Sequence, residues 1–200
     1  MEATSHPLIL ASASKVRSRM LSNAGVNFEI VVSNVDEDAI KAGSSEKSVE
    51  DVALELAIAK AQAVSAHHPE ALVIGADQIL ECDGQLFDKP VGRAGAVQHL
   101  ESLRGKLHRL ITAATVIHGG EIMWQVTADV RLTMRDLSDD FIKSYLDKAG
   151  DDVLASVGAY RLEDIGAQLF SHVEGDFFTV LGLPLLPLLE FLRGQGLMET

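Results

Sequence analysis

Cysteine and aromatic residues are scarce in this sequence. It has one cysteine, Cys82, among 200 residues, so an internal disulfide is excluded and a reducing compartment, the cytoplasm, is expected. Aromatic residues make up 5% of the chain, which leaves few rings on which the bases of a nucleic acid would stack. The longest apolar run, residues 180–189, is broken by Pro184 and Pro187, and we therefore expect no membrane span.

Positive charge is scarce as well. The chain carries 17 Lys and Arg against 29 Asp and Glu, a net charge of −12, whereas a general nucleic-acid binder would need a basic surface. The apolar fraction of 47% is that of an ordinary globular protein. A chain of 200 residues without a linker-like segment predicts a single domain, residues 1–200.

Hydrophobic periodicity predicts an α/β fold in which helices flank a mixed β-sheet. Strands are expected at 8–11, 28–32, 71–76, 107–117, 121–134, 159–162 and 177–181. Helices are expected at 14–25, 48–67, 94–103, 138–148 and 184–193. The polar and acidic segment 34–45 is expected to be a loop. The pair Asp83-Gly84 predicts a hairpin turn, and the pair Gly119-Gly120 stands between the strands expected at 107–117 and 121–134.

Three cations follow the first predicted strand, against the acidic composition. Lys15, Arg17 and Arg19 come directly after the strand and the helix-capping residues Ser12 and Ser14. A strand, a serine-rich turn and a helix together offer an anion free backbone N–H groups, hydroxyl donors and a forked guanidinium. The chain has no Walker A sequence. Solvated helix charges are the alternative explanation of the same pattern.

Lys60 and Asp77 are ionisable residues in apolar surroundings. Lys60 lies four residues after Leu56 on the apolar stripe of its predicted helix, so its ammonium must either reach solvent or pair with an anion. Asp77 is expected at the carboxyl end of the strand 71–76, the edge of an α/β sheet at which ligands bind. A turn-forming aspartate is the alternative there.

Two further charged residues fall in predicted loops. Glu37, in the stretch VDEDA, is expected to join Asp77 as an oxygen ligand of a Mg²⁺ ion that also contacts phosphate groups. Lys89 precedes Pro90, which stiffens the loop that holds the lysine. A solvated acidic loop and a surface lysine account for the same residues. The seven histidines show no zinc-binding spacing.

Seven segments, in order along the chain, carry a resemblance to a known family. They are LILASASKVRSRML, VDED, LAIAKA, VIGADQIL, DKP, GKLH and GDFFTVLGLPLLPLL. From about Leu8 to Leu192 the sequence resembles the Maf-like family of nucleoside triphosphate pyrophosphatases. This resemblance implies an α/β fold of the Maf/ITPase type, with a bent mixed sheet, two lobes and a central cleft. It also implies a homodimer.

The same resemblance implies hydrolysis of a nucleoside triphosphate between its α and β phosphates, with a divalent cation, Mg²⁺ or Mn²⁺. Asp77 would accept the proton of the attacking water, and Glu37 and Asp77 would bind the metal. The substrate would be bound by Ser12, Ser14, Arg17, Lys60 and Lys89. No nucleic-acid or membrane partner is expected.

Three positions distinguish branches of this family. The branch that hydrolyses dTTP and UTP carries arginine, threonine and glutamine, and the branch that acts on 7-methyl-GTP carries an apolar residue, usually tryptophan, with glutamine and glutamate. Val16, Gln78 and Glu163 resemble the second set. A carboxylate suits the donor edge of guanine or the charge of a 7-methylated base. The alternatives are a dTTP/UTP pyrophosphatase and a non-enzymatic nucleotide-binding regulator of cell division.

Overall fold

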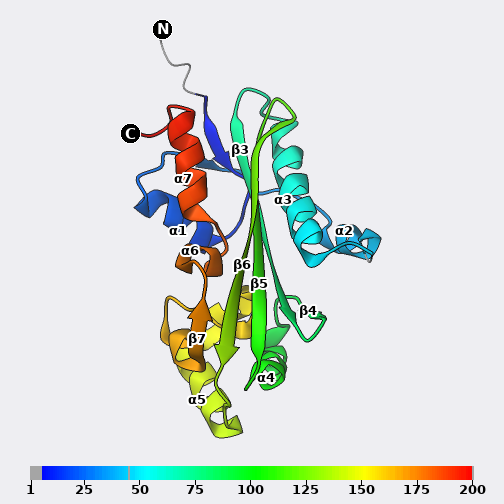
Figure 1. Cartoon of the computed structure of the whole chain (residues 1–200), viewed down its shortest axis with the longest axis vertical. Coiled ribbons are helices and arrows are strands. Elements are labelled where there is room, and N and C mark those ends of the chain that lie inside the picture. Colours follow the sequence, from blue (N-terminus) through cyan, green and yellow to red (C-terminus); the bar gives the residue numbers. More distant parts are fainter. Residues whose placement is uncertain (1–5, 45, 200) are drawn as a thin grey trace. The chain divides into compact units, whose positions relative to one another are not determined.

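The computed structural model describes residues 6–44 and 46–199, and within them seven strands form one mixed sheet. The order is β2-β1-β3-β5-β6-β7, with β4 paired to β3. The strands are β1 (Leu8–Leu10), β2 (Glu29–Ile30), β3 (Leu72–Cys82), β4 (Gln85–Phe87), β5 (Leu107–His118), β6 (Glu121–Met134) and β7 (Phe170–Glu174). β1 runs parallel to β2 and β3, whereas β3 with β4 and β6 with β7 are antiparallel. The predicted α/β class and mixed sheet are confirmed (Figure 1).

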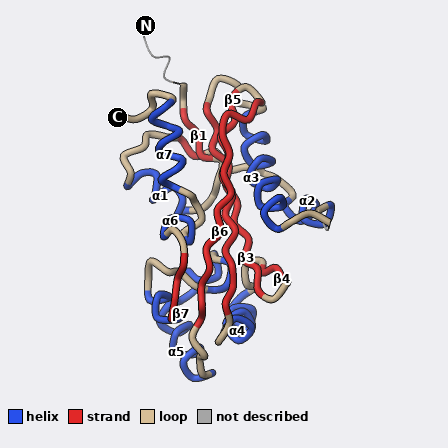
Figure 2. The backbone as a smooth tube through the Cα atoms, viewed as in Figure 1, coloured by secondary structure: helices blue, strands red, loops and turns tan. Residues whose placement is uncertain are grey.

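Helices flank the strands, as the sequence predicted (Figure 2). They are α1 (Lys15–Asn23), α2 (Glu37–Gly43), α3 (Val49–Ser65), α4 (Gly92–Leu103), α5 (Asp139–Ala149), α6 (Phe177–Val180) and α7 (Leu185–Gly194). Short 3₁₀ segments, η1 (Gly150–Ala155), η2 (Val157–Ala159) and η3 (Ile165–Leu169), follow α5. In the part of the chain that the structure describes, no helix combines the length and the apolar character needed to cross a membrane.

The residues pack as two compact units. The first contains the residues up to Gln78, Thr112–Ala128 and those from Gly182 onward, and the second contains Ile79–Ile111 and Asp129–Leu181. β3, β5 and β6 contribute residues to both units. The assignment of residues 1–200 to a single domain therefore stays a prediction.

The hairpin turn predicted at Asp83-Gly84 is confirmed, and Gly119-Gly120 lies between β5 and β6 as expected. Asp83 and Gly84 have φ values of 53° and 80°, and Gly119 and Gly120 have φ values of 56° and 85°. Two successive residues with positive φ form the type I′ turn, whose twist matches that of the strands it joins.

Three predictions of local structure were wrong. The segment 34–45 contains α2 rather than only a loop, because the Asp36 carboxylate caps it by accepting from the Ala39 N–H at 3.0 Å. The segment 177–181 contains α6 rather than a strand, because the Asp176 carboxylate caps α6 by accepting from the Thr179 N–H. The segment 159–162 is not a strand, because Ala159 has a φ of 59° that breaks an extended backbone.

Helix α3 approaches strand β3 very closely in the first unit, and Figure 1 places α2 and α3 on one side of the strands with α1 and α7 on the other. The contact is at Gly75. A Cβ atom on Gly75 would lie 2.2 Å from the Ala57 carbonyl oxygen and 2.8 Å from the Ala61 Cβ. Glycine on the strand permits this spacing, and Lys60 on α3 lies 2.5 Å from Asp77 on β3.

We predict that Gly75→Ala destabilises the protein by about 1 to 3 kcal/mol, the usual cost of overpacking a core. The added methyl group meets backbone atoms of α3 that have no free direction in which to move. Urea unfolding measures the change. Gly194→Ala is the matched control, because a Cβ at that position contacts nothing within 4 Å. Equal stability of the two variants would contradict the close packing of α3.

Candidate functional site

Strand β1 is much shorter than its parallel neighbour β3, and the site lies where β1 ends. The Ala11 N–H donates to the Ile74 carbonyl at 2.8 Å, which is the last bond between the two segments. The next carbonyl along that edge of β3, at Ala76, accepts instead from Nη1 of Arg17 at 3.0 Å. The guanidinium of Arg17 therefore takes the place that a longer β1 would have filled.

Arg17 is fixed by three oxygen acceptors. Besides the Ala76 carbonyl, its Nε donates to the Gly182 carbonyl at 2.6 Å and its Nη1 donates to Ser12 Oγ at 3.3 Å. Gly182 has a φ of +96°, and a Cβ on it would lie 3.3 Å from Nη2 of Arg17. Glycine is thus needed at 182 both for the backbone conformation and for the room beside the guanidinium.

The side-chain oxygens of the two predicted serines accept hydrogen bonds from the chain. Ser12 Oγ accepts from the Ser14 N–H at 3.2 Å, and Ser14 Oγ caps α1 by accepting from the Arg17 N–H at 3.4 Å. A hydroxyl that accepts a bond retains one O–H donor. In the described residues, Nη2 of Arg17 has no hydrogen-bond partner. Burial lowers the pKa of Arg17, and the nearby Asp77 and Glu37 oppose this shift.

Lys60 joins two carboxylates that come from different elements. Its Nζ lies 2.5 Å from Oδ1 of Asp77 on β3 and 2.8 Å from Oε1 of Glu37, the first residue of α2. Lys60 is 9% exposed and Asp77 is 7% exposed. The ammonium on the apolar stripe of α3 thus pairs with anions rather than extending to solvent.

The predicted position of Asp77 at the end of its strand is wrong. β3 continues from Leu72 to Cys82, so Asp77 lies in its middle. The position still resembles a strand end on one side, because β1 pairs with β3 only as far as Ile74. The shorter partner leaves the middle of β3 without a neighbouring strand on that side, beyond the carboxyl end of β1. In α/β sheets, ligands bind at the carboxyl ends of strands.

The carboxylates of Glu37 and Asp77 have the donor chemistry that a divalent cation needs. Both are oxygen donors within 2.8 Å of one nitrogen, so the fold brings them together. Mg²⁺ is usually held by one or two protein carboxylates, with water and substrate phosphates as its other ligands. No group of three or more His, Cys, Asp or Glu suited to a metal occurs among residues 6–44 and 46–199. Glu37 and Asp77 supply two oxygen donors, and a protein usually contributes one or two carboxylates to Mg²⁺.

Two of the predicted specificity residues lie beside this cluster in sequence. Gln78 follows Asp77, and its side-chain amide donates to Thr112 Oγ1 at 2.8 Å on β5. Thr112 is fully buried, so the amide of Gln78 is held in one orientation. Val16 is half-buried on α1, directly before Arg17.

The other two predicted site residues belong to the second unit. Lys89 is exposed and makes no hydrogen bond or ion pair with any described residue. Glu163 lies in the turn before η3, where Nε of Arg161 donates to its Oε1 at 3.3 Å. The roles of Lys89 and Glu163 stay predictions.

Sequence reasoning missed two residues that hold the predicted ones in place. Gly182 anchors Arg17 through its carbonyl, and Arg161 binds Glu163. The segment LGLPLL, within GDFFTVLGLPLLPLL, indicates a special backbone position at Gly182, because a glycine there precedes a rigid proline-containing stretch. Arg161 had a weaker signal, an isolated cation followed by the acidic residues Glu163 and Asp164.

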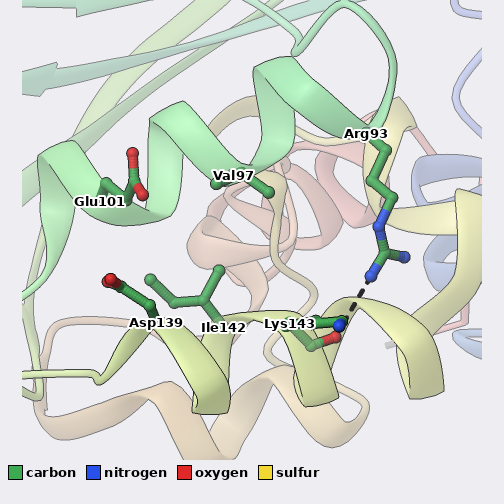
Figure 3. A pocket seen from close by; sticks show the side chains of 6 residues that line it. All are labelled: Arg93, Val97, Glu101, Asp139, Ile142 and Lys143. Carbon is green, nitrogen blue, oxygen red and sulfur yellow. Dashed lines mark hydrogen bonds between the residues drawn. The ribbon is translucent and has the colours of Figure 1, made fainter.

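A shallow groove of about 260 Å³ lies between α4 and α5 in the second unit (Figure 3). Val97 on α4 and Ile142 on α5 are among its lining residues, and Arg93, which also lines it, binds Asp147 and the Lys143 carbonyl. None of the predicted site residues lines it. We therefore assign the candidate site to the cluster around Lys60 and Asp77 and not to this groove.

Comparisons with known proteins show the family of the chain. The model of the family described as Maf-like protein matches residues 7–195. A protein of Nitrobacter hamburgensis named nucleoside triphosphate pyrophosphatase is 53% identical over 96% of this chain and 96% of its own. A protein of Rhizobium johnstonii named 7-methyl-GTP pyrophosphatase is 44% identical over 96% of this chain and 98% of its own. A dITP/XTP pyrophosphatase structure from Mycobacterium abscessus covers 66% of this chain and 74% of its own, at 17% identity and a TM-score of 0.36, too low to support any argument.

We predict that Lys60→Met destabilises the protein by about 3 kcal/mol, because breaking a buried ion pair leaves an uncompensated charge. Asp77 is the carboxylate left without its lysine. Adding Asp77→Asn to this variant should recover part of the loss, since a neutral amide needs no cation. Chemical denaturation measures all three proteins.

Lys47→Met is the control for this experiment. Lys47 pairs with Glu55 at 2.7 Å, but the two side chains are 45% and 40% exposed, and such pairs contribute at most about 1 kcal/mol. If Lys60→Met and Lys47→Met cost the same, the pairing inferred for Lys60 does not matter to the fold.

Proposed function

Because the chain belongs to the Maf-like protein family, we propose that it is a nucleoside triphosphate pyrophosphatase. It cleaves the anhydride between the α and β phosphates and releases a nucleoside monophosphate and pyrophosphate. The observation that carries this proposal is the cluster in which Lys60 joins Glu37 and Asp77 beside the anchored Arg17. Cationic side chains suit the phosphate groups of a triphosphate, and neighbouring carboxylates suit the metal ion bound to it.

In this proposal the cations bind the phosphates. Arg17 is held by carbonyl oxygens, so its donors are fixed before the substrate arrives, and Nη2 and the hydroxyls of Ser12 and Ser14 supply the contacts. Positioning and charge stabilisation provide most of the catalysis in phosphoryl transfer. Lys89 is proposed as a further substrate-binding cation.

Asp77 is the proposed proton acceptor. Water attacks phosphorus, its proton passes to the Asp77 carboxylate, and the bridging P–O bond breaks so that pyrophosphate leaves with the electron pair. Glu37 and Asp77 would hold Mg²⁺ or Mn²⁺. When bound, such an ion would supply positive charge to the phosphate groups.

The proposed substrates are modified nucleotides, with 7-methyl-GTP as the type. Val16, Gln78 and Glu163 support this choice, and the Rhizobium johnstonii relative carries a name of the same kind. Glu163 would accept from the donor edge of guanine and compensate the positive charge of a 7-methylated base. We place the reaction in the cytoplasm.

We predict faster pyrophosphate release from 7-methyl-GTP than from dTTP or UTP in the presence of Mg²⁺ or Mn²⁺. A nucleotide panel assayed with inorganic pyrophosphatase and phosphate detection measures the ratio of kcat/KM values. Faster turnover of dTTP would assign the chain to the dTTP/UTP branch. Nucleotide binding without turnover in either metal would favour a regulatory protein instead.

We predict that Asp77→Asn lowers kcat by about 100-fold or more, the usual contribution of a positioned general base. The variant should remain folded, because Lys60 keeps Glu37 as its second partner. Pyrophosphate release and a thermal unfolding curve test both statements. Asp51→Asn is a suitable control, since Asp51 is an exposed residue in the first turn of α3. Full activity of Asp77→Asn would mean that another group accepts the proton.

A further inference from the structure

Two buried tyrosines of the second unit make hydrogen bonds next to the turn that carries Glu163. Tyr160 is 4% exposed, and its hydroxyl lies 2.9 Å from Nε2 of His108 on β5. Tyr145 on α5 donates its hydroxyl to the Ala159 carbonyl at 3.3 Å. Burial lowers the pKa of His108 to about 4, so near neutral pH the contact with Tyr160 is a hydrogen bond between uncharged groups.

The backbone of the same turn has little freedom. Ala159 adopts a φ of 59°, a conformation that a residue other than glycine keeps only when its surroundings enforce it. On the other side, a Cβ on Gly166 would lie 2.3 Å from the Arg161 carbonyl oxygen and 2.8 Å from its nitrogen. The backbone of Arg161 is therefore packed directly against Gly166, independently of the contacts of its side chain.

The guanidinium of Arg161 lies among three carboxylates. Its Nε donates to Oε1 of Glu163 at 3.3 Å, and its Nη1 lies 3.1 Å from Oδ2 of Asp152 and 3.8 Å from Oδ2 of Asp164. Asp152 belongs to η1 and Asp164 caps η3. Arg161 and Glu163 have side chains that are 19% and 14% exposed, whereas those of the two aspartates are 81% and 55% exposed.

One cation shared by three anions orients Glu163 without neutralising the group. Asp152 and Asp164 use the Nη1 end of the guanidinium, and the Nε end holds Glu163. A forked guanidinium can fix the direction of a carboxylate in a way that a single ammonium cannot. The cluster retains an excess of negative charge, which favours a cationic or donor-bearing group beside it over an anionic group.

We propose that Arg161 is a positioning residue that fixes the Glu163 carboxylate for recognition of a nucleobase that is cationic or presents N–H donors. This inference rests on the proposed function, because it assumes that Glu163 contacts the base of a nucleotide substrate. Arg161 itself contacts Glu163 and not the reacting phosphates. Its removal should therefore change the affinity for one class of base and spare the chemistry.

The test compares 7-methyl-GTP with ribose 5′-triphosphate, which has the same phosphates and no base. We expect Arg161→Gln to lower kcat/KM for 7-methyl-GTP about tenfold through KM, the loss of one well-oriented polar contact. The value for ribose 5′-triphosphate should stay unchanged. Arg161→Lys should restore only part of the loss, because lysine keeps the charge and lacks the fork.

The double variant decides whether Arg161 acts through Glu163. Glu163→Gln should lower the same kcat/KM value, and adding Arg161→Gln to it should cause no further loss, since coupled residues are not additive. Arg93→Gln is the matched control, because Arg93 pairs with Asp147 in the same unit and lies outside the turn. It should leave both substrates unaffected.

Equal losses for the two substrates, or additive losses in the double variant, would overturn the proposal. An unchanged or increased preference for 7-methyl-GTP in Arg161→Gln would overturn it as well. If Arg161→Gln does not fold, as judged by circular dichroism, Arg161→Lys carries the same expectation with a smaller effect. Failure of the wild-type protein to release pyrophosphate from any nucleotide would instead refute the proposed function, so the two failures are distinguishable.

Discussion

The contact between Gly75 and helix α3 is the constraint on which the candidate site depends. A Cβ atom at this position would overlap the Ala57 carbonyl, so helix and strand are nearer than two ordinary side chains permit. This spacing lets the Lys60 ammonium reach Asp77 at 2.5 Å while both residues stay about nine-tenths buried. With a wider gap the same two charges would be separated and partly uncompensated, which is costly in a protein interior.

A second constraint is the short length of β1. Its pairing with β3 ends early, and the carbonyl of Ala76 would lose its hydrogen bond if nothing replaced the strand. Arg17 fills that role with one nitrogen and reaches Gly182 with another. A strongly acidic chain can thus hold a cation in a fixed place, because backbone carbonyls orient the guanidinium as well as carboxylates do.

In the second unit, the restrained feature is the carboxylate of Glu163, which lies in a turn. Tyr145 and Tyr160 fix the turn from inside, and Gly166 fixes the backbone of Arg161. Arg161 then restricts the side chain of Glu163. An exposed glutamate on a flexible loop would sample many rotamers and would distinguish bases poorly, since ordering it on binding costs entropy.

The sequence by itself determined the fold class, the main helices, the long hairpin of β5 and β6, and the two glycine turns, because these follow from local periodicity and from backbone conformations that glycine favours. It also singled out Lys60, since a lysine on an apolar stripe must either reach solvent or pair with an anion. Only the tertiary structure decided which anions those are, because Glu37, Lys60 and Asp77 come from separate elements. Capping by Asp36 and Asp176 turned segments expected as a loop and a strand into helices. The tertiary structure also decided the roles of Gly182 and Arg161. The Gly182 carbonyl accepts from Arg17, which is distant in sequence, and Arg161 contacts carboxylates of three residues, so no local sequence pattern predicts either contact.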